Sequence, residues 1–363
     1  MQVTRRNAFR ARAATSLWVI GLVAVLVVVV ATRLDWAQST LYLQLHSFGD
    51  TRGVTVLSPL VDLDKDFSDR TGLRVKFGVD AVAAASDACA RCHPQGAHDR
   101  RIYADVGLRR KFGATTLEVG GEISRENFYA SESVTASVSR DFNRGNTTIA
   151  GAYSFSLNNP QLHPSQNVEQ QLSHDASVAL TQTLSKTTIV QLSYDFNRVS
   201  GYQSSPFLRT SVNGQMVLGV VPDLRNRQAF GVRVRQALPA DTYLQADFRR
   251  YFDSWSVGSN TLSLGASHFF SRAWLAGFTY RWYDQTGAFF YQPQYFGTPE
   301  YFTGDYRLAP FSSGLYTGRV VYTPEDGLLG LPKGTALELQ YDRYVGSNQF
   351  QAAVFSAGLR IPF

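Results

Sequence analysis

Two cysteines and a histidine form the most specific chemical motif in this sequence. Cys89, Cys92 and His93 spell C-x-x-C-H, in which two thiols bond covalently to a haem and the adjacent imidazole ligates its iron. The chain contains no other cysteine. The spacing therefore predicts a bound c-type haem (haem c), with Cys89 and Cys92 as attachment sites and His93 as the first iron ligand.

Other side chains near the motif bear on what it holds. A haem iron ligated by His93 has a second axial position, and three histidines are predicted near the same end of the molecule: His98, His163 and His174. Two alternative interpretations stay open. Cys89 and Cys92 could form a small disulfide, or both thiols could bind zinc with His93 and His98, because Cys₂His₂ is a common structural zinc set.

The first 37 residues have the composition of an export signal. A stretch with several arginines, Arg5 to Arg12, precedes an apolar run over 17–31, and small residues follow it. Residues 1–37 therefore predict a secretory signal peptide. The apolar run falls slightly short of the ~20 residues of a membrane-spanning helix, so a retained membrane anchor is the alternative. Export would place the cysteines in an oxidising compartment.

After residue 38, apolar and polar residues alternate over many successive segments. In 187–197, Val190 and Leu192 share one face, and Gln191 and Ser193 share the other. A period of two is that of a β-strand, and about ten to twelve residues is the length of a tilted strand that crosses a bilayer. A soluble β-sandwich is the alternative, but its strands are usually shorter.

The alternating segments predict one all-β domain over 38–363, a transmembrane antiparallel up-and-down β-barrel of about sixteen strands. The longer connections fall at one end: 83–100, 158–172, 198–227 and 285–312. Outer-membrane barrels have short periplasmic turns and long external loops, so loop 83–100 with its C-x-x-C-H motif is expected outside. The predicted strands are 40–48, 54–67, 71–82, 101–112, 115–127, 132–142, 146–157, 173–184, 187–197, 228–238, 241–252, 258–269, 273–284, 313–323, 335–345 and 350–363.

The last predicted strand, 350–363, ends the chain on an aromatic residue. Phe355, Leu359, Ile361 and Phe363 lie on one face of this strand. A terminal Phe on an alternating strand is typical of the signal by which outer-membrane barrels are recognised for insertion. We therefore expect the barrel-assembly machinery and outer-membrane lipid to be partners.

Several stretches resemble a known family. These are "GVTVLSPLVDLDKDFSDRTGLRVKFGVDAVAAAS", "TTLEVGGEISRENFYASESVTASVSRDF", "YQSSPFLRT" and "LPADTYLQADFRRYFDSWSVGSNTLSLGASHFF". They are similar to an uncharacterised family of bacterial outer-membrane barrels, catalogued only as a domain of unknown function. The resemblance covers nearly all of the chain after the signal peptide. It implies an outer-membrane barrel and little chemistry, and C-x-x-C-H is an addition to the common pattern of the family.

Many charged residues fall on the predicted inner face of the strands. They either pair across the lumen and hold the barrel together, or line a selective aqueous pore, for which sixteen strands leave room. The residues are Arg74, Lys76, Asp80, Asp105, Arg109, Lys111, Glu118, Glu122, Asp175, Asp195, Arg233, Arg235, Asp247, Arg249, Arg281, Glu338, Asp342 and Arg360.

The stretch 287–311 is dense in tyrosine and phenylalanine. It is expected to fold into the barrel mouth as a plug, with binding of an outside ligand as the alternative. Either arrangement would place these aromatic side chains at the end that carries the long loops.

The remaining features narrow the class of function. The net charge is +6, but no dense basic run follows the N-terminus, which disfavours nucleic-acid binding. No Ser-His-acid set is evident, so we expect no enzyme. The sequence predicts a porin-like, multi-pass outer-membrane barrel that carries one haem for surface electron transfer with a c-type cytochrome partner. The alternative is a structural or solute-passing barrel without haem.

Overall fold

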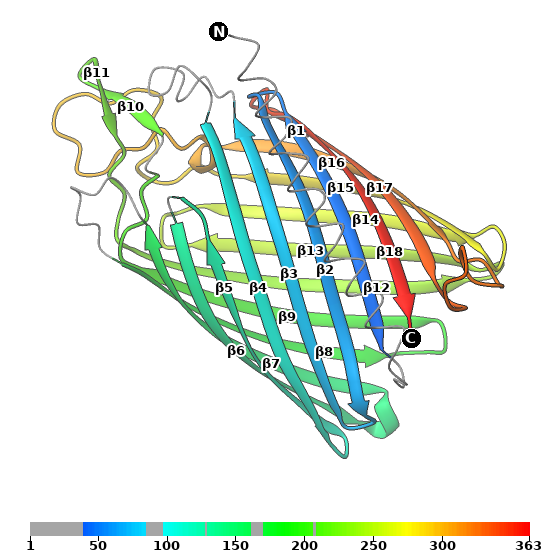
Figure 1. Cartoon of the computed structure of the whole chain (residues 1–363). Helices are drawn as coiled ribbons and strands as arrows, with labels where there is room; N and C mark the ends of the chain where they lie inside the picture. The colour runs from blue at the N-terminus through cyan, green and yellow to red at the C-terminus, as the bar shows by residue number, and fades with distance from the viewer. Residues whose placement is uncertain (1–38, 85–96, 128, 161–169, 206–207) are drawn as a thin grey trace, which may run out of the picture.

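The computed structural model describes residues 39–84, 97–127, 129–160, 170–205 and 208–363. Within these residues, sixteen antiparallel strands pair in a closed ring, which confirms the predicted all-β up-and-down barrel (Figure 1). The barrel strands are β1 (Thr40–Asp50), β2 (Val54–Ser68), β3 (Thr71–Ala84), β4 (Ala97–Phe112), β5 (Thr115–Arg125), β6 (Tyr129–Phe142), β7 (Thr147–Pro160), β8 (Gln171–Thr183), β9 (Thr188–Ser200), β12 (Leu224–Leu238), β13 (Thr242–Asp253), β14 (Gly258–Phe269), β15 (Trp274–Gln285), β16 (Phe311–Tyr322), β17 (Ala336–Gly346) and β18 (Gln351–Pro362).

The first and last strands close the ring. β1 pairs with β18 along its whole length, with Leu45 opposite Ala357. Beyond the strand ends, the backbone N–H of Ser39 donates to the carbonyl of Phe363 at 3.0 Å, and the N–H of Phe363 donates back at 2.9 Å. The described ends of the chain therefore lie side by side, and the pairing leaves no free edge in the ring.

The side chains of each strand alternate between the outside of the barrel and its lumen. Leu192, Val232 and Phe248 lie directly opposite one another on β9, β12 and β13, and all three remain substantially exposed. Their neighbours Gln191 and Asp247 point to the other side. Apolar side chains thus cover the outside and polar ones line the lumen, in the predicted register.

The strands are long enough to cross a bilayer. They have 11 to 16 residues. At about 3.4 Å per residue and a tilt of about 40°, even the shortest rises roughly 28 Å, close to the hydrocarbon thickness of a membrane. Aromatic side chains face outward near both ends: the Trp274 and Tyr322 rings lie 4.5 Å apart at one end, and Phe155 lies 5.1 Å from His174 at the other.

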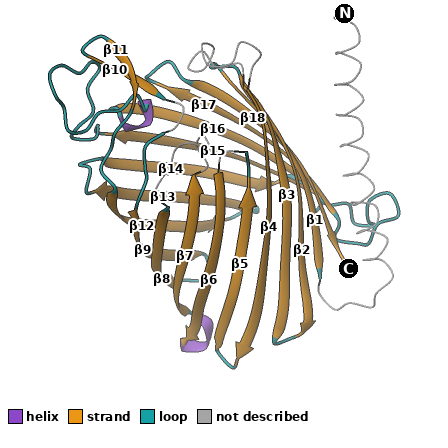
Figure 2. Cartoon of the chain, turned by 60° about the vertical axis from the view of Figure 1, so that its left-hand side comes forward, coloured by secondary structure: helices purple, strands orange, loops and turns teal. Residues whose placement is uncertain are grey.

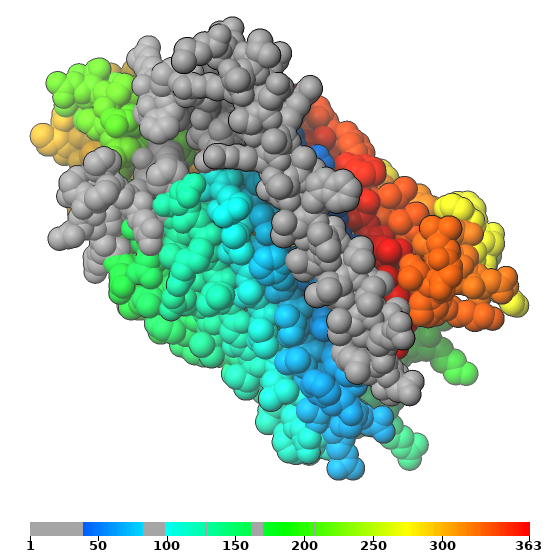
Figure 3. All heavy atoms as spheres, viewed as in Figure 1, coloured from blue at the N-terminus to red at the C-terminus, as the bar shows by residue number. Residues whose placement is uncertain are grey.

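The two ends of the barrel differ, as predicted. Short turns, among them 239–241 and 270–273, join the strands at one end, which we call the turn end; the connection 323–335 there is longer. The opposite end, the loop end, carries the longer connections. Figure 3 shows 270–273 (yellow) and 323–335 (orange) projecting away from the green hairpin of the loop end. β3 and β4 extend further than predicted, which shortens the connection expected over 83–100.

Helical structure is sparse in the described part of the chain. It consists of two short 3₁₀ helices, η1 (Asn143–Gly145) and η2 (Tyr306–Leu308). No helix among these residues is long and apolar enough to cross a membrane.

A small hairpin stands outside the ring at the loop end. It consists of β10 (Arg209–Val212) and β11 (Gln215–Leu218), within a region predicted only as loop. Asn213 and Gly214 join the two strands with positive φ angles of 52° and 81°. An Asn-Gly pair favours this type of turn, so the sequence held a signal for the hairpin that the prediction missed.

The aromatic stretch 287–311 packs against this hairpin and against the β13–β14 connection. Backbone bridges join Val212 to Tyr295 and Val220 to Phe302. A buried cluster, which we call the rim cluster, contains Trp255, Val257, Ala288, Phe290 and Leu308. Figures 1 and 2 show these segments beyond the strand ends at one side of the mouth. The stretch therefore builds part of the rim, and its Tyr306 ring also contacts Arg52 of the β1–β2 turn, with 3.4 Å between the guanidinium carbon and the ring centroid.

A buried carboxylate organises the base of the rim cluster. The Asp253 side chain is fully buried, and its Oδ1 accepts from the backbone N–H groups of Trp255 and Val257 at 2.9 and 3.0 Å. Its Oδ2 accepts from the Tyr251 hydroxyl at 2.6 Å and from Arg225 Nε at 2.8 Å. The Arg225 guanidinium also lies over the Trp255 ring, 4.2 Å from its centroid. Asp253 thus links two barrel strands to the loop above them.

The alternation of the wall predicts opposite effects of a charge at neighbouring positions. Val178 faces outward near the middle of β8, and Ser177 faces the lumen. We expect Val178→Arg to cost about 2–4 kcal/mol of folding free energy in lipid vesicles, and Ser177→Arg to cost less than about 1 kcal/mol, because only the former places a cation in hydrocarbon. Reversible urea unfolding in vesicles measures both. Equal losses would contradict the assigned faces.

The Asp253 network predicts a local effect on the rim. Asp253→Ala leaves the largely buried Arg225 without its carboxylate, which costs about 3–5 kcal/mol. We expect faster proteolysis within 286–310 and altered fluorescence of Trp255, with the barrel still folded by its heat-dependent gel mobility. Asp326→Ala, at a fully exposed carboxylate of the turn end, is the control. A proteolysis rate equal to that of the control would show that Asp253 does not hold the rim.

Candidate functional site

The charged side chains that were predicted to face inward do face the lumen. Asp247 lies opposite Arg233 on the neighbouring strand, in the register that alternates with the outward Phe248. Register pairing around the ring assigns every predicted interior charge to the same inner face. The confirmed positions are Arg74, Lys76, Asp80, Asp105, Arg109, Lys111, Glu118, Glu122, Asp175, Asp195, Arg233, Arg235, Asp247, Arg249, Arg281, Glu338, Asp342 and Arg360.

Ion pairs in the lumen run along the wall. Arg74 Nη2 lies 2.7 Å from Asp62 Oδ2 on the adjacent strand, and Arg249 Nη2 lies 3.2 Å from Asp195 Oδ2 two strands away. Both arginines are about half exposed, so each pair contributes only about 0–1 kcal/mol. These pairs hold long side chains against the wall and do not bridge the lumen.

Charges of opposite sign gather on opposite walls. The acidic wall consists of the inward residues of β2–β5, and the basic wall consists of those of β12–β16; in the ring, β3 and β4 stand opposite β13 and β14. Such an arrangement produces a field across the lumen. The acidic wall carries Asp62, Asp64, Asp66, Asp80, Asp99, Asp105, Glu118 and Glu122 beside Arg74, Lys76, Arg101, Arg109 and Lys111. The basic wall carries Arg225, Arg227, Arg233, Arg235, Arg249, Arg281 and Arg319 beside Asp247 and Asp253.

Between these walls lies a third with short side chains, the hydroxyl wall of β6–β8. The Thr135 hydroxyl donates to Ser154 Oγ at 2.9 Å, so these groups also bond to one another along the surface. Small hydroxyl residues bind water and take little space, which leaves room beside this wall. Its members are Ser131, Ser133, Thr135, Ser137, Ser139, Ser154, Ser156, Ser173, Ser177 and Thr181.

Glycine lets a bulky side chain lie close to the wall. A Cβ atom at Gly78 would lie only 2.3 Å from Cζ of Tyr103, which sits opposite on the next strand. The Tyr103 ring therefore occupies the space that a side chain at position 78 would need. This close approach keeps the ring against the acidic wall and away from the centre of the lumen.

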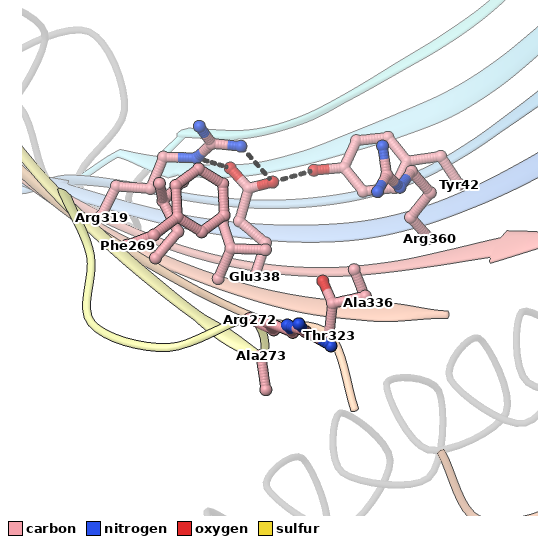
Figure 4. Close-up of a pocket in the computed structure, with 11 residues that line it drawn as sticks. Tyr42, Phe269, Arg272, Ala273, Arg319, Thr323, Ala336, Glu338 and Arg360 are labelled. Atoms are coloured by element: carbon pink, nitrogen blue, oxygen red, sulfur yellow. Dashed lines mark hydrogen bonds and ion pairs between the residues drawn. The ribbon is translucent and has the colours of Figure 1, made fainter. Parts of the chain in front are cut away.

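A pocket of about 660 Å³ lies on the inner face at the turn end (Figure 4). Its charged residues are Arg272, Arg319, Arg360 and Glu338. The remaining lining residues are mainly apolar or aromatic: Tyr42, Phe269, Ala273, Leu275, Val321, Thr323 and Ala336. The pocket joins β1 to β14–β18, so residues from both ends of the sequence build it.

Within this pocket, Glu338 is held by two neighbours. Arg319 Nε and Nη2 donate to its two carboxylate oxygens at 2.5 and 3.0 Å, and the Tyr42 hydroxyl donates to Oε2 at 3.2 Å (Figure 4). Tyr42 reaches Glu338 across Gly358, where a Cβ atom would lie 2.7 Å from the tyrosine hydroxyl. The carboxylate is thus neutralised by Arg319, and Arg272 and Arg360 form no ion pair with any described residue.

At the loop end, outside the strands, Asp305 and Arg307 form an ion pair. Asp305 begins η2: its carboxylate accepts from the backbone N–H of Arg307 at 3.0 Å and from the Arg307 guanidinium at 2.6 Å. Hydrogen bonding to this carboxylate raises the pKa of Arg307 above its ordinary value. The pair stabilises the turn that leads from the aromatic stretch into β16.

The residues predicted for haem lie mostly beyond the described chain. Cys89, Cys92, His93 and His163 are outside the described residues, as is the predicted signal peptide 1–37. The backbone of His98 belongs to β4, and its side chain is not described.

His174 is the one predicted ligand whose side chain is described. It lies on the outward register of β8, with Nδ1 2.7 Å from the Tyr153 hydroxyl. The structure therefore places this imidazole on the outer surface near the loop end and not inside the mouth. Among the described residues, no group of three or more His, Cys, Asp or Glu side chains has the arrangement of a metal site.

Several residues of the lumen escaped the sequence prediction. Asp62, Asp64 and Asp66 alternate within a predicted strand, a pattern that could have identified them as inward-facing. Arg225 and Arg227 fall within the predicted loop 198–227, but β12 begins at Leu224 and includes them. No local sequence pattern indicates that pocket residues such as Arg319 lie together, because only the closed ring brings their strands side by side.

Solved structures that align with this chain include outer-membrane proteins. OccK1 (OpdK) of Pseudomonas aeruginosa aligns with 7% identity and a TM-score of 0.46, over 90% of this chain and 98% of that one. A loop-deletion mutant of OmpT from Vibrio cholerae aligns with 9% identity and a TM-score of 0.48, over 90% of this chain and 98% of that one. The siderophore receptor PirA of P. aeruginosa aligns with 13% identity and a TM-score of 0.44 over 86% of this chain, which spans only 56% of the receptor.

Sequence comparison identifies the family. A search of curated proteins finds no match. The family model described as "Protein of unknown function (DUF3570)" matches residues 89–344, which is more than half of the sequence and includes the predicted C-x-x-C-H motif. The chain therefore belongs to this DUF3570 family.

Proposed function

We propose that the protein is a porin-like channel of the outer membrane that lets small polar solutes through its lumen. The observation that carries this proposal is the two-faced wall, with Leu192 and Phe248 outward and Gln191 and Asp247 inward. An apolar outside suits lipid, and a polar inside suits water. The short side chains of the hydroxyl wall, and the ion pairs that run along the wall, favour an open lumen over one filled by inward side chains.

The outer membrane is the location that fits this architecture. A closed barrel satisfies all backbone hydrogen bonds within lipid, and bacterial outer membranes contain barrels with even strand numbers, short turns and long loops. The described strands have this asymmetry. We infer that the loop end faces outside, that lipid contacts the apolar band, and that the barrel-assembly machinery inserts the chain.

Cysteine accessibility tests the channel. In a Cys89→Ala, Cys92→Ala background, Ser177→Cys places a thiol in the lumen and Val178→Cys places one against lipid. We expect a charged, membrane-impermeant thiosulfonate reagent to change the single-channel conductance of the first variant and not of the second. Absence of any conductance in planar bilayers before the reagent is added would contradict the proposal, as would modification only at position 178.

We further propose that the channel carries one covalent haem c on its loop end. The C-x-x-C-H spacing in an exported chain supports this: the thiols of Cys89 and Cys92 would add to the two haem vinyl groups, and His93 would ligate iron. His98 or His163 would supply the second ligand. A haem at the surface suits electron exchange with a c-type cytochrome.

The haem proposal has a direct test in a host that matures c-type cytochromes. We expect the purified protein to carry the mass of one haem and to give a pyridine haemochrome spectrum. Cys89→Ala with Cys92→Ala should abolish both while the barrel still folds, and His93→Ala should alter the iron spectrum. Wild-type protein without covalent haem would refute the proposal; a mass lower by two hydrogens would then identify a disulfide, and bound zinc a metal site.

A further inference from the structure

We propose that the turn-end pocket is a binding site for small organic anions. The carboxylate of the ligand would contact Arg272 and Arg360, and the apolar body of the ligand would contact Phe269 and Leu275. This inference rests on the proposed channel function and adds to it the class of solute that the lumen holds. Figure 4 shows Arg272, Arg360 and Phe269 around one space, which Leu275 also lines.

The charge of the pocket favours an anion. Among the described residues, its lining contains three arginines and a single carboxylate, Glu338. Arg319 and Tyr42 already bond to that carboxylate, which is only 23% exposed. Arg272 and Arg360 are exposed and form no ion pair with any described residue. Two guanidinium groups thus remain to bind a ligand, and guanidinium matches the geometry of a carboxylate.

The rest of the lining favours an organic body over a bare inorganic ion. The Phe269 ring is exposed, and Leu275, Val321 and Ala336 supply aliphatic surface beside it. Binding sites for small molecules usually combine apolar walls with a few polar groups that fix the orientation of the ligand. The volume of about 660 Å³ lies within the usual range for such ligands.

The position of the pocket connects it to passage through the barrel. Tyr42, Arg319, Glu338 and Arg360 all lie on the inward register near the turn end, and Arg272 lies in the adjoining turn. A solute that crosses the lumen therefore passes this pocket at the turn end. The pocket would concentrate organic anions there, because fixed cations raise the local concentration of opposite charge.

Current block by benzoate tests the site in full-length protein in planar bilayers. We expect benzoate to reduce the single-channel current of wild-type protein in a saturable way. Arg272→Gln with Arg360→Gln should raise the half-blocking concentration about tenfold, the factor that corresponds to about 1.4 kcal/mol. Arg281→Gln, at a lumen arginine outside the pocket lining, is the matched control and should leave it unchanged.

A second variant should shift the block in the opposite direction. Glu338→Gln removes the one carboxylate among the described lining residues and frees Arg319, so we expect a lower half-blocking concentration. General loosening of the barrel would not tighten binding. The lack of any block in a conducting channel would overturn the site, as would an equal effect of Arg281→Gln.

The outcomes separate the site from the proposed function. If no variant conducts, the channel proposal fails, and calorimetric titration of the detergent-solubilised protein with benzoate then tests the site alone. Heat of binding that disappears in Arg272→Gln with Arg360→Gln would uphold the site, and no heat with wild-type protein would refute it.

Discussion

The pairing of β1 with β18 is the interaction on which the rest of this structure depends. In a membrane, an unpaired backbone N–H or C=O group costs several kcal/mol, so a sheet must close on itself. β1 and β18 meet along their whole length, and Ser39 and Phe363 extend the pairing past the strand ends. Once the ring is closed, each residue faces either lipid or lumen, and its chemistry follows from its position.

The alternation forced by closure gives the lumen its character. Polar side chains face inward, but their lengths and charges differ among the walls: acids on β2–β5, arginines on β12–β16, and short hydroxyl residues between them. Long side chains are held down by neighbours, as Arg74 is by Asp62, or lie over glycine, as Tyr103 does over Gly78. The same interior can therefore be charged and still leave space for water, which links the fold to passage of solutes.

The sequence predicted the ring and its faces because a slip of one residue exchanges the two faces of a strand. The alternation of Gln191 and Leu192 has only one register that keeps polar groups out of lipid. The local sequence pattern could not predict contacts that form only when the ring closes. The Tyr42 hydroxyl reaches Glu338 because β1 and β17 both flank β18. The local pattern also predicted the start of β12 four residues too late, because Arg225 is positioned by its contacts with Asp253 and Trp255. The packing of the rim cluster was missed for the same reason.

A channel of this kind requires that water fills the lumen from end to end. Swelling of proteoliposomes in solutions of neutral sugars tests it directly, because an uncharged solute isolates the width of the passage from its charge. We expect vesicles containing the protein to swell in a small sugar such as arabinose, and the rate of swelling to fall as the sugar grows larger. Swelling no faster than in protein-free vesicles, for every sugar, would show that the lumen is closed.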